Sequence, residues 1–139
     1  MPVTPNSIIT PQTPRSAAVI VNAAQTTFPP TTSPNNTALL VTAGANGGRL
    51  TRLVALPQET TGGAGVMQVF RDVGTAGAEQ YLFATAACGA DTVGATDAPV
   101  ALDFGYSDDN PLILQANERL YVATGIAKHI AFIAEWADY

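Results

Sequence analysis

The last stretch of the chain, residues 111–139, constrains the fold most, because it reads as short apolar runs separated by turns. Residues 112–114 and 120–124 are β-rich and are joined by the turn-like segment 115–118. The final run, 129–136, alternates in a way that gives a strand two apolar faces, with Ile130, Phe132 and Ala134 on one side and Ala131 and Ile133 on the other. We therefore expect 120–124 and 129–136 to form a hairpin at the core of a sheet.

The same alternation of short strands and turns runs through the rest of the chain from residue 17. Further strands are expected at 17–22, 37–42, 49–56, 66–73, 80–87 and 100–106, which gives eight or nine in all. The turn at 43–48 contains Asn-Gly, which adopts positive φ at little cost. Within 49–56, residues 53–56 are all apolar, so this strand is expected to contain a bulge or to be buried on both faces. This spacing predicts an all-β protein, an antiparallel β-sandwich of jelly-roll-like form.

Composition agrees with this fold class. Only 12% of the 139 residues are charged and 47% are hydrophobic, which disfavours both a disordered chain and long solvated helices. The length is that of one domain. The predicted core contains Leu40, Leu53, Val69, Leu82, Ala101, Leu120, Val122, Ile130 and Phe132.

The beginning of the chain differs from the remainder, because seven of the ten prolines fall within residues 2–34. Proline fixes φ and removes a backbone donor, so we expect residues 1–16 to form an extended arm and residues 17–139 the sandwich domain. The apolar side chains in the arm allow two interpretations: a segment that docks on a partner, or a frayed terminus. The candidate partner-binding residues are Val3, Pro5, Ile8, Ile9 and Pro11.

The net charge of −5 argues against nucleic-acid binding, because neutralising phosphates requires clustered Lys and Arg. The five arginines and Lys128 are scattered along the sequence. No apolar run reaches the 18 or more residues of a membrane span, and the N-terminus lacks a signal core. We expect no membrane association and a protein made in the cytoplasm.

Residues that carry chemistry are few. His129 is the only histidine and is expected to enter a strand at a sheet edge, while Cys88 is the only cysteine and is expected to be a buried or half-buried inert thiol. Asp103, Asp108 and Asp109 cluster around one loop, where oxygen ligands can bind calcium, yet their spacing matches no EF-hand and favours solvated turn carboxylates. The sequence predicts no cofactor, no obligatory metal and no enzymatic activity.

Three segments resemble a family of small virion proteins of tailed bacteriophages and prophages: 2–14 (PVTPNSIITPQTP), 42–50 (TAGANGGRL) and 137–139 (ADY). The resemblance implies a structural role, as a capsid decoration or cement protein on the capsid surface, made in the cytoplasm of the bacterial host. It implies the major capsid protein as partner and self-association, with a trimer favoured. It carries over no catalytic residue.

Two alternatives remain beside the decoration protein. The first is a head-fibre, neck or tail component, which differs only in its place in the particle. The second is a carbohydrate-binding β-sandwich, in which aromatic side chains would stack on sugars. The residues available for stacking are Tyr106, Tyr121, Trp136 and Tyr139.

Overall fold

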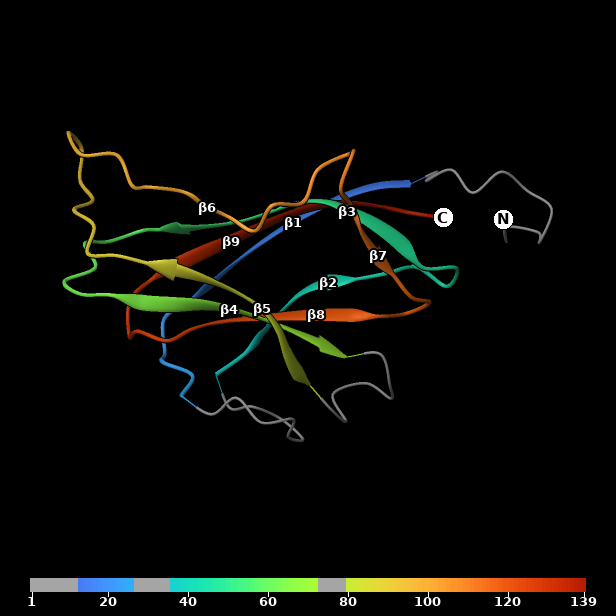
Figure 1. Ribbon diagram of the computed structural model, residues 1–139, viewed down its shortest axis with the longest axis horizontal. Helices are drawn as coiled ribbons and strands as arrows, with labels where there is room; N and C mark the ends of the chain where they lie inside the picture. Colours follow the sequence, from blue (N-terminus) through green and yellow to red (C-terminus); the bar gives the residue numbers. More distant parts are fainter. Residues whose placement is uncertain (1–12, 27–35, 73–79) are drawn as a thin grey trace.

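The computed structural model describes residues 13–26, 36–72 and 80–139, which form strands and loops without a helix (Figure 1). The strands are β1 (Thr13–Val21), β2 (Ala38–Thr42), β3 (Gly48–Pro57), β4 (Gly65–Asp72), β5 (Tyr81–Cys88), β6 (Leu102–Asp103), β7 (Leu112–Leu114), β8 (Arg119–Thr124) and β9 (Ile130–Asp138). No helix in these ranges has the length and apolarity needed to cross a membrane.

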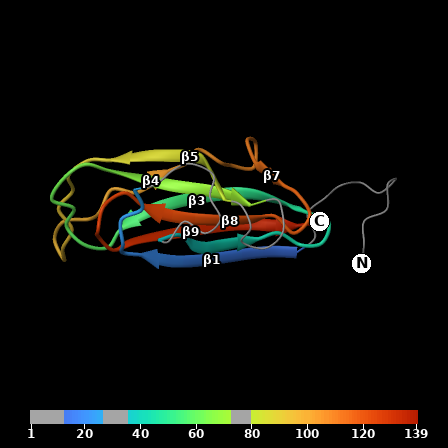
Figure 2. The same cartoon turned by 90° about the horizontal axis from the view of Figure 1, so that it is seen from below.

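The strands form two sheets that stack on each other (Figures 1 and 2). The first sheet has the order β1-β9-β3-β6, with β7 also paired to β3, and the second has the order β2-β8-β4-β5. All pairs between these strands are antiparallel. Most strands that follow each other in sequence lie in opposite sheets, as in a jelly roll. The predicted antiparallel β-sandwich is confirmed.

The core lies between the sheets, and seven of its nine predicted members are buried. Leu53, Val69 and Phe132 are fully buried there, and the Phe132 ring lies 6.4 Å from that of Phe104. Two core predictions were wrong: Leu82 is half-buried and Ala101 is exposed. Leu82 belongs to the edge strand β5, and Ala101 lies just before the short strand β6, so neither is enclosed by strands on both sides.

The alternation predicted for the final run is correct, but the predicted hairpin is wrong. Ile130, Phe132 and Ala134 of β9 are fully buried and point into the core. However, β8 belongs to the second sheet and β9 to the first, so residues 125–129 cross between the sheets. This arrangement lets Val122 and Phe132 face the same core from opposite sides, which a hairpin within one sheet would not.

The N-terminal boundary also differs from the prediction. β1 begins at Thr13, and residues 13–16 pair with 135–138 of β9, so they belong to the domain and not to the arm. Pro14 is tolerated because β1 is an edge strand, which needs backbone hydrogen bonds on one side only. The remaining arm, residues 1–12, lies outside the described residues.

Two strand predictions changed in detail. The strand predicted at 100–106 shrinks to Leu102–Asp103, because Gly105 has a φ of +89° and its N–H donates to Asp103 Oδ1 (2.8 Å). In β3, the pairing shifts between Leu50 and Arg52, which makes the expected bulge, and the residues after it are buried on both faces. The turn before β3 needs glycine at position 47, where φ is +83° and a Cβ would lie 2.4 Å from the Leu114 carbonyl oxygen.

Candidate functional site

The outward side of β3, β9 and β1 is the candidate partner-binding surface, called the outer face below. Because side chains alternate along each strand, every second residue of these strands points away from the core. The strand register aligns these outward residues in rows across the sheet. From one end to the other, the rows are Arg49, Ala137 and Pro14; Arg52, Glu135 and Ser16; Val54, Ile133 and Ala18; and Leu56, Ala131 and Ile20.

The last two rows are entirely apolar, although the outer side of an antiparallel sheet is usually polar. Ile20 is 57% exposed, Ala18 is exposed, and Ile133 and Leu56 are half-buried. The row beside them carries an ion pair, Arg52 Nη1 to Glu135 Oε1 at 3.5 Å, in which both side chains are about half exposed. The outer face is therefore apolar at one end and charged towards the other.

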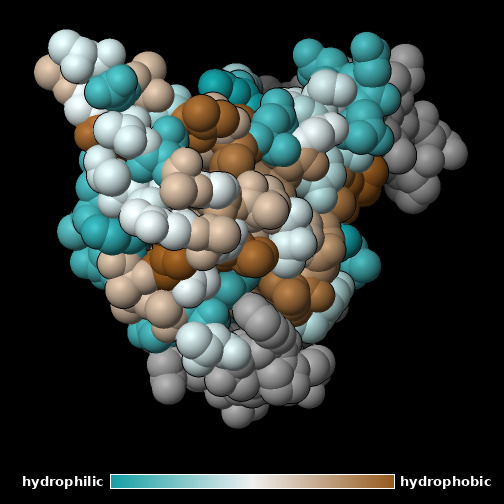
Figure 3. Space-filling model, turned by 60° about the vertical axis from the view of Figure 1, so that its left-hand side comes forward, coloured by the Kyte–Doolittle hydropathy of each residue, from teal (hydrophilic) through white to brown (hydrophobic). Residues whose placement is uncertain are grey.

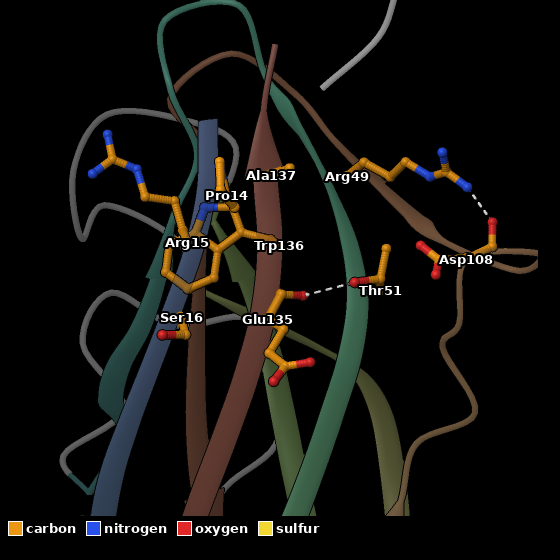
Figure 4. A pocket seen from close by; sticks show the side chains of 9 residues that line it. All are labelled: Pro14, Arg15, Ser16, Arg49, Thr51, Asp108, Glu135, Trp136 and Ala137. Carbon is orange, nitrogen blue, oxygen red and sulfur yellow. Dashed lines mark hydrogen bonds between the residues drawn. The ribbon is translucent and has the colours of Figure 1, made fainter. Parts of the chain in front are cut away.

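The polar end of the outer face holds a depression of about 560 Å³ (Figure 4). Its lining residues come from β1, β3, β9 and the loop before β7: Pro14, Arg15, Ser16, Arg49, Thr51, Asp108, Glu135, Trp136 and Ala137. In Figure 4 the Arg49 guanidinium points to the Asp108 backbone and donates to its carbonyl oxygen. Thr51 Oγ1 donates to the Glu135 carbonyl oxygen at 3.4 Å. The walls thus carry both charges, with Arg15 and Arg49 on one hand and Asp108 and Glu135 on the other.

Asp138 fastens three parts of the chain beside this depression. Its carboxylate is buried and accepts hydrogen bonds from the Gly44 N–H (2.9 Å) and from Trp136 Nε1 (3.2 Å), both at Oδ1. Its other oxygen, Oδ2, accepts from Arg15 Nε at 3.1 Å. One side chain therefore links β1, β9 and the turn that precedes β3.

The segments that carry the family resemblance meet at this same end. Residues 13–14 and 48–49 flank 137–138 on the two sides of β9, and the Tyr139 N–H donates to the Gly47 carbonyl oxygen (3.1 Å). The predicted partner-binding residues Val3, Pro5, Ile8, Ile9 and Pro11 lie outside the described residues. The chain enters the domain at Thr13, next to the depression.

The predicted aspartate cluster does not form a metal site in the described part of the chain, where no group of three or more potential ligands gathers. Asp103 Oδ1 accepts the hydrogen bond of the Gly105 N–H, and Asp108 uses its backbone carbonyl for Arg49. Cys88 is 4% exposed, which confirms the predicted burial of this thiol.

The aromatic side chains considered for sugar stacking do not share a surface. Trp136 is 8% exposed and belongs to the core between the sheets. Tyr121 lies on β8 in the second sheet, whereas Tyr139 follows β9 of the first sheet. Tyr106 packs against the core at its edge, where burial raises its pKa. A flat stacking platform is absent from these four residues.

His129 precedes β9, as predicted for a strand-entry residue, but the predicted sheet edge is wrong, because β9 lies between β1 and β3. His129 contacts Glu59, which the sequence did not single out. His129 Nδ1 contacts Glu59 Oε2, its N–H donates to the same oxygen (3.2 Å), and Lys128 Nζ lies 3.2 Å from Oε1. These contacts lower the pKa of the Glu59 carboxyl from 4.5 to about 2. The hydrogen bond with the His129 side chain has the largest effect, followed by the His129 backbone N–H and Lys128. The contacts tie the loop after β3 to the β8–β9 connection.

This depressed pKa predicts a pH-dependent contribution to stability. A carboxylate with a lowered folded-state pKa stabilises the fold fully above its unfolded value, and the contribution disappears as pH falls from about 4.5 towards 2. Glu59→Gln should lower the melting temperature slightly at neutral pH, since the cluster is exposed, and should have no effect near pH 2. Thermal melts of both proteins across this range measure it. An equal difference at both extremes would contradict the assignment.

Sequence reasoning missed the buried ion pairs of the second sheet. Glu118 and Asp72 are fully buried, although carboxylates usually lie at the surface. Arg71 Nε contacts Glu118 Oε1, an interaction that raises the pKa of Arg71, and Arg119 Nη2 lies 3.6 Å from Asp72 Oδ2. Residues 71–72 are basic then acidic, and residues 118–119 are acidic then basic. This complementary order is the sign of the pairing that the sequence carries.

Comparison with known proteins gives a fold likeness and no family. No family model matches the sequence, and no curated protein is similar to it. The described fold resembles a solved structure of Eiger TNF from S. frugiperda, with a TM-score of 0.50 and 12% sequence identity over 92% of this chain and 93% of that one. At this identity the likeness concerns the β-sandwich fold alone.

Proposed function

We propose that this protein is a structural component of a tailed-bacteriophage virion, a decoration or cement protein that binds the major capsid protein on the capsid surface. The observation that carries the proposal is the meeting of the resembling segments at one end of the sandwich, around Asp138 and the depression. Segments that are far apart in sequence, resemble one family and gather in one place are expected to serve a common attachment or folding role.

The attachment would use this end of the molecule. The described chain begins at Thr13, one residue before Pro14 of the depression, and we propose that Val3, Ile8 and Ile9 bind a capsid subunit at this end. Burying three such side chains contributes roughly 1.5–3 kcal/mol each, before the cost of ordering the segment. Repetition over many copies would then fasten a layer to the shell. We propose no cofactor, no nucleic-acid partner and no catalysis in this role.

Removal of residues 2–12 tests the attachment. The deletion ends before β1, so the melting temperature of the isolated domain should stay unchanged, while binding to purified capsids should weaken at least about tenfold, the equivalent of one buried apolar side chain. Cosedimentation with capsids measures the binding. A full-length variant with Val3, Ile8 and Ile9 changed to serine separates loss of apolar contacts from loss of length.

Undiminished binding by both variants would show that residues 2–12 are a terminus without a docking role and that attachment lies on the sandwich. Binding to isolated tails, and not to capsids, would favour the alternative of a head-fibre, neck or tail component. The resemblance favours a trimer in the assembled particle, and native mass spectrometry of the soluble protein measures the number of copies.

A further inference from the structure

The apolar end of the outer face has the composition of a buried surface. β1, β9 and β3 carry apolar residues on both sides here, a pattern typical of strands that are covered on both faces. Within the described part of the chain, no residue covers Ile20 fully, and its exposed fraction is 57%. A sheet face of this kind is covered most simply by another sheet that presents apolar residues at matching positions.

We propose that the outer face binds the outer face of a second copy, around a two-fold axis that runs along the strands between β3 and β9. With such an axis, each row of one copy lies over the same row of the other copy. The two strands exchange places, so that β3 of one copy lies over β9 of the other. Interfaces with two-fold symmetry are self-complementary, so every favourable contact occurs twice. The proposal concerns self-association and does not depend on the virion role.

Charge complementarity selects this arrangement. The two-fold axis stacks one apolar row of each copy on the other, with Val54, which is buried within its own copy, opposite the partner's half-buried Ile133. In the adjacent row, it places Arg52 over the partner's Glu135 and Glu135 over the partner's Arg52. Stacked sheets lie about 10 Å apart, a gap that an arginine and a glutamate side chain span together. The ion pair within each copy thus extends to a four-charge cluster across the interface.

Apolar exposure alone does not select the outer face, because other apolar residues are exposed as well. On the side turned forward in Figure 3, apolar residues gather near the middle, surrounded by polar ones. Val100, in the loop between β5 and β6, is 63% exposed, slightly more than Ile20. No row of opposite charges is aligned by strand register beside Val100, since it lies outside the strands.

The size of the outer face indicates weak association. Four rows on three strands make a small interface, and small interfaces are typical of weak, transient complexes. We expect dimers at high protein concentration, and firm contact where many copies are held on one surface. Sedimentation velocity of the full chain over a concentration series measures this equilibrium.

Charge exchange provides the decisive experiment. Arg52→Glu and Glu135→Arg each place like charges opposite each other in the dimer, so each variant alone should associate at least about tenfold more weakly than the natural sequence. A mixture of the two variants should restore association, because the all-acidic row of one then faces the all-basic row of the other. Mixing cannot repair the ion pair within either copy, so the restored association reports the contact between copies.

Apolar substitutions supply the control. Ile133→Glu, on a strand beside the two-fold axis, should abolish dimers, whereas Leu39→Glu, on β2 of the second sheet, should leave them unchanged. Thermal melts show whether each variant is folded. The proposal is overturned if both charge variants still associate alone, if their mixture stays monomeric, or if only trimers form. Loss of dimers on deleting residues 2–12 would also overturn it, since the arm would then supply the contact.

Discussion

Replacement of Glu118 with alanine is expected to lower the free energy of unfolding by about 3–5 kcal/mol, the range for breaking a buried ion pair. Glu118 is fully buried, contacts Arg71 Nε and accepts the hydrogen bond of the Gln115 N–H at 2.7 Å. The substitution leaves the Gln115 N–H without its acceptor and the Arg71 guanidinium, whose side chain is 18% exposed, without its carboxylate. Urea unfolding of both proteins measures the difference.

Two further variants make the Glu118 result specific. Asp109→Ala removes an exposed carboxylate and should change stability by less than about 0.5 kcal/mol. In the double variant, both Glu118 and Arg71 are replaced by alanine. Its loss of unfolding free energy should be smaller than the sum of the losses in the two single variants, because no unpaired charge remains. A loss below about 1 kcal/mol for Glu118→Ala would show that the pair does not hold this site together.

Asp138→Ala is expected to cost about 2–4 kcal/mol, because a buried and a part-buried donor lose their shared acceptor. These donors are the Gly44 N–H and Trp136 Nε1, and Arg15 loses its ion-pair partner as well. The turn before β3 and the start of β1 should both loosen. Amide hydrogen exchange should therefore rise in these two segments, together with the drop in unfolding free energy.

Asp138→Asn provides the graded control. The amide oxygen can replace Oδ1 as acceptor, whereas the charge that attracts Arg15 is lost, so we expect a loss smaller than that of the alanine variant. Equal stability of all three proteins would mean that this end of the sandwich is held by backbone pairing alone.

The strands and their inward faces could be predicted from local pattern. The two-residue alternation in β9 identified Ile130 and Phe132 as core, and the glycine-rich turn at 43–48 fixed the start of β3. Such signals depend on residues within a few positions of each other, which a single sequence displays directly.

Sheet membership could not be predicted in the same way. The five residues between β8 and β9 are a length that suits a hairpin as well as a crossing between sheets, and only packing against the remaining strands decides. The buried pair of Arg71 and Glu118 joins residues 47 positions apart, so no local pattern announces it. For the same reason the depression was not foreseen, because β1, β3 and β9 each supply a part of its lining.

The position of β9 has a consequence for how the chain is made. Strand β9 lies between β1 and β3, although both are made well before it, so the first sheet lacks its central strand until β9 has left the ribosome. During synthesis, β1 and β3 remain open edges that can pair with other nascent chains. Folding of this sandwich therefore waits for β9 and, given its non-local pairing, is slow compared with that of helical domains. A chain that ends before β9 would aggregate instead of folding partially.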